Sequence, residues 1–211
     1  MAAFRNRQEA GRELATKVSE LALVDVVVLG LPRGGVPVAA EVARRLSAPL
    51  DVVVVRKLGV PGNPELGMGA IAEEGMVVFN DDVLDMARVD TFDVQSAVGM
   101  ERRNLMDRVD LIRATVRKLD LTGKTAVIVD DGIATGIDAR AACRAARQRG
   151  AAKVVLAAPV APSDWQERLA GEADQFVAVL TPPDFMAVGQ FYEDFSQVSD
   201  SELMGCFDVR A

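Results

Sequence analysis

Five short apolar runs constrain the architecture of this chain more than any other feature. Each run has the length of a strand, and segments with helical spacing lie between most of them. Continuous apolar runs of this kind are typical of strands buried on both faces of a sheet. Because strands that alternate with helices form parallel sheets, we predict an α/β fold with a doubly wound, mostly parallel sheet. The expected strands are residues 24–30, 51–56, 125–130, 153–159 and 175–180.

The remaining segments predict helices, a hairpin and a C-terminal appendage. Residues 68–80 predict two short strands around Glu73–Gly75, and the Gly/Pro-rich residues 59–67 predict a loop. The apolar stripe of residues 92–119 indicates core packing or a dimer seam. We expect an α/β domain over residues 1–183, with the hairpin and residues 184–211 forming a small hood on the same domain. The expected helices are residues 4–21, 36–46, 92–119, 136–150, 163–171 (with Ser163 as N-cap) and about 199–206.

The composition excludes several classes of protein. The chain has no histidine, which excludes Ser–His and Cys–His catalysis and every histidine-containing metal site. Its net charge of −7 argues against non-specific binding to nucleic acid or to an anionic membrane surface. No apolar run is long enough to span a bilayer, no leader pattern is present, and the two cysteines lack metal-type spacing. We therefore expect a cytoplasmic protein with no metal site of its own and no nucleic-acid or membrane partner.

Residues 126–140, AVIVDDGIATGIDAR, contain the clearest indication of a ligand site. Asp130 and Asp131 end a buried strand, and ligands of doubly wound sheets bind beyond the carboxyl ends of the strands. Adjacent carboxylates suit the neighbouring hydroxyls of a ribose, which donate hydrogen bonds. The loop of residues 132–136 then opens a helix, whose amides and the Thr135 hydroxyl would bind a phosphate. The alternative is an acidic strand end followed by a Gly-rich turn, as in many α/β proteins.

The segment VIVDDGIATG resembles the signature of the type I phosphoribosyltransferases, which use phosphoribosyl pyrophosphate (PRPP) with Mg²⁺. LPRGG (31–35) is similar to the pyrophosphate loop of that family, and VVRKLGVPGNPELGMGAI (54–71) to its next loop. PVAP (159–162) and DFMAVGQFYEDFSQVSD (184–200) resemble a bacterial subgroup of largely unassigned substrate. The resemblance covers nearly the whole chain. It implies the type I phosphoribosyltransferase fold and an unusual, cis peptide bond in the pyrophosphate loop.

The resemblance also implies roles for individual residues. Asp130 and Asp131 would hold the ribose hydroxyls, while Arg33 and Lys57 would stabilise the leaving pyrophosphate, and we expect these four to be catalytic. The surrounding residues would bind the substrate: Pro32, Gly34, Gly35, Arg56, Gly132, Ile133, Ala134, Thr135, Gly136 and Asp138. The magnesium ion would be held mostly by oxygens of PRPP and by water.

Several of these residues have a simpler alternative. Arg33 could lie in a surface turn, and Arg56 and Lys57 could be cations solvated at a strand end. Arg102 or Arg103 could cap pyrophosphate or lie on a solvated helix face. Four aromatic residues near the end of the chain could stack on a planar acceptor or pin the tail to the domain: Phe185, Phe191, Tyr192 and Phe195.

The predicted function is transfer of ribose 5-phosphate from PRPP to an unidentified, nucleobase-like acceptor, in nucleotide metabolism, with a homodimer as an open possibility. The alternative is a regulator that senses PRPP or a nucleotide without turnover; a pyrophosphokinase that makes PRPP would need two such domains. No residue is identifiable as the acceptor base. Some family members place an acid where this chain has Ala134, so this chain has no acidic base at that position. In most of the family the phosphate loop ends in Thr or Ser where this chain has Asp138, which predicts weak PRPP affinity or a site altered toward another ligand. The simpler alternative is that Asp138 caps the helix that follows.

Overall fold

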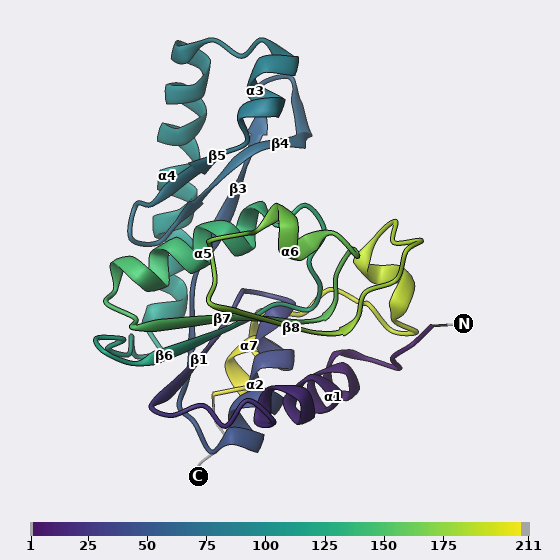
Figure 1. Ribbon diagram of the computed structural model, residues 1–211. Helices are drawn as coiled ribbons and strands as arrows, with labels where there is room; N and C mark the ends of the chain where they lie inside the picture. The colour runs from purple at the N-terminus through teal and green to yellow at the C-terminus, as the bar shows by residue number, and fades with distance from the viewer. Residues whose placement is uncertain (1, 208–211) are drawn as a thin grey trace.

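The computed structural model describes residues 2–207 and is built around a five-stranded parallel sheet (Figure 1). Every neighbouring pair in this sheet is parallel, so all five carboxyl ends lie at one edge. This is the α/β architecture that the apolar runs predict. In spatial order the strands are β2 (Leu50–Val52), β1 (Val26–Gly30), β6 (Thr125–Val129), β7 (Lys153–Val160) and β8 (Gln175–Leu180).

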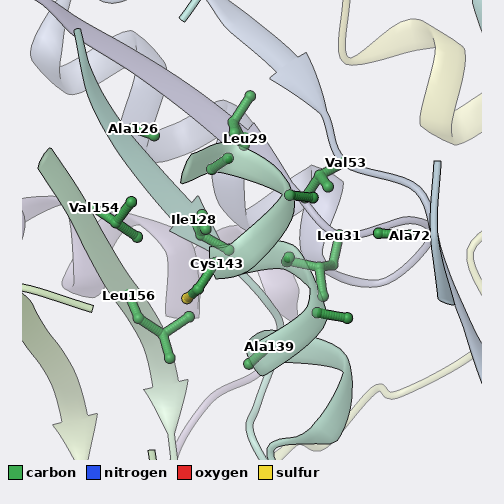
Figure 2. Packing of buried hydrophobic residues seen from close by; sticks show 14 of the residues in the cluster. Leu29, Leu31, Val53, Ala72, Ala126, Ile128, Ala139, Cys143, Val154 and Leu156 are labelled. Carbon is green, nitrogen blue, oxygen red and sulfur yellow. The ribbon is translucent and has the colours of Figure 1, made fainter. Parts of the chain in front are cut away.

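Helices cover both faces of the main sheet because its strands are apolar on both sides (Figure 1). Alternate residues of the strands, such as Val28 and Val127, pack with α1 (Arg7–Ser19) and α2 (Gly35–Leu46) on one face. The residues between them, such as Leu29, pack with α5 (Ile137–Gln148) and α6 (Trp165–Arg168) on the other. Figure 2 shows Cys143 of α5 between the strand side chains of this second layer. The expected N-cap of α6 is wrong: the helix begins at Trp165, and Asp164 takes the cap position.

A second, antiparallel sheet with two helices forms a separate layer beyond α5 (Figure 1). The expected strand 51–56 is in fact divided. The main-sheet strand β2 ends at Val52, and Val55 begins a new strand. Residues 59–67 are not a loop: β3 and β4 pair as a hairpin around a turn in which Gly62 has φ +80°. The hairpin expected near Glu73–Gly75 is confirmed by the β4–β5 pairing. These elements are β3 (Val55–Val60), β4 (Asn63–Ala72) and β5 (Val77–Phe79).

The helices of this second layer agree with the expectation at the start of the long helix but not at its end. A short, unexpected helix α3 (Asp81–Ala87) precedes α4 (Thr91–Arg113), which begins one residue before the expected start and ends before residue 119. Beyond the helix, the backbone N–H of Leu119 donates to the buried Asp51 carboxylate at 3.1 Å, which ties this part of the chain to the main sheet. Leu105 and Ile112 of α4 are fully buried, so the apolar stripe serves as core.

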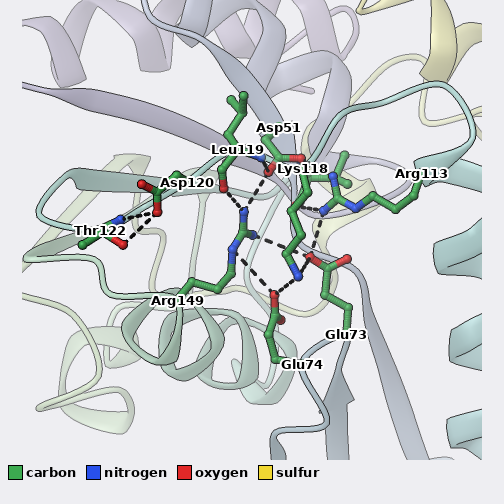
Figure 3. A network of polar contacts seen from close by, with 10 residues as sticks. Asp51, Glu73, Glu74, Arg113, Lys118, Leu119, Asp120, Thr122 and Arg149 are labelled. Atoms are coloured by element: carbon green, nitrogen blue, oxygen red, sulfur yellow. Dashed lines mark hydrogen bonds and ion pairs between the residues drawn. The ribbon is translucent and has the colours of Figure 1, made fainter.

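A buried ionic network joins the two sheets (Figure 3). Asp51 of β2 is fully buried and pairs with Arg113 of α4 and Arg149, the C-cap of α5. Arg113 also pairs with Glu73 at 2.8 Å, just beyond β4. Charges so far from water persist only when they are paired. The network therefore fixes the second layer to the main sheet.

The C-terminal segment returns to the carboxyl edge of the main sheet. It contains η1 (Val188–Phe191) and the short helix α7 (Asp200–Gly205), in which Ser199 is the N-cap. Tyr192 bridges to Phe4, so this segment lies beside the first residues of the chain. Residues 208–211 of the expected appendage lie outside the described residues. Within the described part, none of the helices has the length and apolar character needed to cross a bilayer.

Candidate functional site

The loop between β6 and α5 forms a small hollow at the carboxyl edge of the main sheet. The hollow has a volume of about 100 Å³ and is lined by Asp130, Gly132, Ile133, Ala134, Thr135, Gly136, Asp138 and Ala139. Gly136 caps α5 in the left-handed conformation, φ +81°, and makes no side-chain cap. The first amides of α5 are therefore open to a ligand, and such amides favour an anion.

The two aspartates at the end of β6 have different surroundings. Asp130 lines the hollow, and its Oδ1 accepts the backbone N–H of Asp131 at 2.8 Å. The Oδ2 atom of Asp131 accepts from Arg7 Nε at 2.7 Å. Burial and the neighbouring Asp131 charge raise the pKa of Asp130 well above the usual value. Burial also raises the pKa of Asp131, while the Arg7 guanidinium opposes that rise.

The PRGG loop passes directly beside this acidic pair. The peptide bond between Pro32 and Arg33 is cis, as the family resemblance implies. A Cβ atom at Gly35 would lie 2.6 Å from the carbonyl oxygen of Val129, and one at Gly34 would collide with the Asp131 carboxylate. Only glycine allows so close an approach, so both glycines are required by packing at the loop.

The Arg33 side chain reaches the C-terminal segment. Its Nη1 donates to the carbonyl of Val198 at 3.3 Å and lies 3.7 Å from Asp200. Arg108 of α4 shares the same carboxylate at 2.7 Å. Arg33 thus joins the pyrophosphate-type loop to α7, and its charge is already partly compensated within the chain.

Arg56 and Lys57 lie on opposite faces of β3, because successive side chains of a strand alternate. Arg56 Nε donates to Glu101 of α4 at 2.7 Å. Lys57 lies on the other face, where its positive charge is near enough to Asp138 to oppose the rise in pKa that burial causes in that carboxyl group. The structure therefore brings Lys57 to the loop, while Arg56 is turned toward α4.

Asp138 is in the first turn of α5 but does not cap it. Its Oδ1 atom is buried without a hydrogen-bond partner, and burial raises the pKa of the carboxyl group. The alternative that Asp138 serves as an ordinary helix cap thus has no support from the contacts. Its carboxyl group lines the same hollow as the open amides.

The aromatic residues near the end of the chain serve at least partly to fix the tail. Tyr192 packs against Phe4 and Phe195 with its ring tilted to theirs, and its hydroxyl donates to the carbonyl of Asp131 at 2.6 Å. Phe185 and Phe191 stack on each other, with centroids 5.7 Å apart. Tyr192 and Phe195 are thus pinning residues, and the stacked pair remains a candidate for contact with an acceptor.

Three contacts of the site escape sequence reasoning: Arg7 with Asp131, Asp200 with Arg33, and Glu101 with Arg56. Each joins residues more than forty positions apart, so no local pattern could have revealed them. Arg102 and Arg103 are exposed on α4. Among the described residues, no group of three or more acidic or cysteine side chains is placed to hold a metal ion.

Comparison with known proteins gives a consistent result. A family model described as a phosphoribosyl transferase domain matches residues 3–191. Two Mycobacterium tuberculosis proteins, from strains CDC 1551 and H37Rv, are each named "putative phosphoribosyl transferase" and are 52% identical over 99% of this chain. The match covers 47% of those proteins, so this chain spans about half the length of the curated relatives. The crystal structure of TT1426 from Thermus thermophilus is similar over 98% of both chains, with 43% identity and a TM-score of 0.82.

Proposed function

This chain belongs to the phosphoribosyl transferase domain family, and on that premise we propose that it transfers ribose 5-phosphate from PRPP to an acceptor nucleophile, releasing pyrophosphate. The observation that carries the proposal is the hollow at the start of α5. It combines open helix amides, which suit a phosphate, with the Asp130 carboxyl group, which suits a hydroxyl.

The chemistry requires stabilisation of two developing charges. Breaking the bond between C1 and the pyrophosphate oxygen gives C1 positive character and leaves both bonding electrons on pyrophosphate. Asp130, which borders the hollow, would accept hydrogen bonds from the ribose hydroxyls, and the acidic pair at the end of β6 would place negative charge near C1. Lys57, the amides of the PRGG loop and Arg33, once released from Asp200, would stabilise the leaving group.

Magnesium would enter as part of the substrate, bound to PRPP. The Asp130 carboxyl group, which borders the hollow, offers the kind of oxygen ligand that this ion accepts. The ion usually keeps several waters and binds substrate phosphates. When bound, it would reduce the negative charge on the departing pyrophosphate.

The acceptor would approach C1 from the side opposite the leaving group. The stacked Phe185 and Phe191 rings offer an aromatic surface, which favours a planar, nucleobase-like acceptor. Ala134 lies exposed in the phosphate loop, where some family members place an acid, so an acceptor base would have to come from elsewhere.

A second function is favoured by the ion pairs within the chain. Arg33 and Arg56 are each paired with a carboxylate of this chain, and Asp138 places negative charge beside the phosphate amides. Such a site would suit a protein that senses PRPP or a nucleotide without transferring the ribose.

Pyrophosphate release separates these two functions. Purified protein would be incubated with PRPP, Mg²⁺ and single nucleobases, and pyrophosphate measured by a coupled assay. Release that depends on an acceptor supports the transferase. Binding of PRPP without release, with all bases tested, supports the sensor, and no binding of PRPP contradicts both.

A further inference from the structure

Asp130 and Asp131 project to different sides of the strand end. Asp130 borders the hollow with residues 132–136, whereas the Asp131 carboxylate lies between Arg7 and the Gly34 backbone. Asp131 is also fixed through its backbone, because its carbonyl accepts the Tyr192 hydroxyl at 2.6 Å. The pair therefore does not present two equivalent carboxylates to one ligand.

Arg7 is itself held in place by several contacts. It is only 9% exposed, at the first position of α1, which Asn6 caps through its side chain. Its Nη1 donates to the carbonyl of Ser196 at 2.7 Å, and the guanidinium lies 4.1 Å from the centre of the Phe195 ring. An arginine fixed by stacking and hydrogen bonds loses little freedom when it binds a carboxylate.

We propose that Arg7 is a positioning residue, which ties Asp131 to α1 and the tail and leaves Asp130 as the carboxyl group that accepts the ribose hydroxyls. This inference rests on the proposed function, since it concerns the ribose subsite of the same hollow. It assigns different roles to the two acids of the signature. Asp130 contacts the ligand, and Asp131 acts through Arg7 by fixing the loop.

The charges around the pair explain why a cation is needed there. Asp131 and Asp138 both place negative charge near Asp130, and both disfavour its ionisation. Lys57 acts on Asp138, and the Tyr192 hydroxyl is neutral because burial raises its pKa. Arg7 is the cation that acts directly on Asp131. Without Arg7, the charge of the Asp131 carboxylate next to Asp130 would have no cation beside it. Asp130 would then keep its proton to a higher pH.

The test compares ribose 5-phosphate with methyl phosphate by calorimetry between pH 5 and pH 9. Both probes are phosphate monoesters that titrate in the same range, so the ratio of their two affinities isolates the contribution of the ribose. In the unmodified protein the ratio should fall as the pH drops and Asp130 gains a proton. In Arg7→Gln the midpoint of that fall should move upward by about one pH unit or more, roughly a tenfold loss of preference on the acid side.

The two aspartate variants separate contact from positioning. Asp130→Asn should abolish the preference for ribose 5-phosphate, whereas Asp131→Asn should keep most of it and move the midpoint downward. Equal loss in both variants would overturn the proposal, because Asp131 would then contact the ribose itself. This comparison remains decisive if Arg7→Gln does not fold.

Two further variants serve as controls. Arg12→Gln removes another cation of α1, which is largely exposed and lies 3.9 Å from Glu41, and should leave the pH midpoint unchanged. Arg7→Lys keeps the charge and should restore much of the midpoint. An unmodified protein that binds ribose 5-phosphate no tighter than methyl phosphate would contradict the proposed function. A normal preference with an unmoved midpoint in Arg7→Gln would contradict only the role of Arg7.

Discussion

Replacing Asp138 by threonine should tighten phosphate binding at the start of α5. The carboxyl group of Asp138 lines the hollow formed by residues 130–139, and its Oδ1 atom has no hydrogen-bond partner. When ionised it repels a phosphate that binds the same amides, whereas a threonine hydroxyl can donate to that phosphate. The nearby Lys57 charge cancels part of the repulsion.

The expected gain follows from the charges involved. Two unit charges ~4 Å apart interact by about 1 kcal/mol in water and about 4 kcal/mol at an effective dielectric constant of 20. Lys57 offsets part of this repulsion, so the gain in binding free energy should lie near the lower end of that range. We expect about 1–2 kcal/mol, or roughly 5- to 30-fold tighter binding of the anion.

Calorimetry with sulfate, which does not titrate near neutral pH, gives the cleanest measurement. Burial raises the pKa of Asp138, so sulfate should bind the unmodified protein more tightly as the pH falls and this carboxyl group is protonated. In Asp138→Thr that component of the pH dependence should disappear. Asp93→Thr, in the first turn of α4, is the matched control and should change nothing. Equal or weaker sulfate binding in Asp138→Thr would refute the repulsion argument and show that this carboxyl group does not affect the anion.

Three other variants test the packing around the site. The pKa of Asp130 is raised in the folded state, so its protonated form favours folding. This contribution to stability is present at low pH and is lost as the pH rises and the carboxyl group ionises. The free energy of unfolding in urea should therefore be about 1–3 kcal/mol higher for Asp130→Asn than for the unmodified protein at pH 8, and equal for the two proteins in acid. Gly34→Ala should lower the melting temperature and weaken ribose 5-phosphate binding, because the added methyl group collides with Asp131. Arg113→Met leaves Asp51 and Glu73 short of a cation and should destabilise by about 3–5 kcal/mol; loss below 1 kcal/mol would show that the network is not fully buried.

The main sheet could be predicted because its strands are continuous apolar runs, a local and strong signal. The second sheet was predicted only in part. Residues 59–67 are rich in glycine and proline, which favours a loop, yet Gly62 supplies the left-handed turn of a hairpin. After α4, Leu119 is bonded to Asp51, which is far away in sequence, so the expected helix does not extend to residue 119. Tertiary contacts such as this one override local propensity.

The site was predictable where it is continuous in sequence. The loop after β6 combines an acidic strand end with a glycine at the start of a helix, and both signals are local. The different directions of Arg56 and Lys57 follow from the alternation of side chains along a strand, which is also a local property of the sequence. The pairing of Asp131 with Arg7 could not be predicted, because the two residues are 124 positions apart.

The contacts of Arg7 also fix the order in which the site can form during synthesis. Arg7 leaves the ribosome well before Asp131, and Ser196 follows later still. The guanidinium therefore has neither of these partners while most of the sheet is being translated. The signature loop reaches its final form only when the segment of Tyr192 and Ser196 has emerged and closed over it. A nascent chain that stops before this segment would contain all five strands of the parallel sheet but would lack the contacts that complete the ligand site.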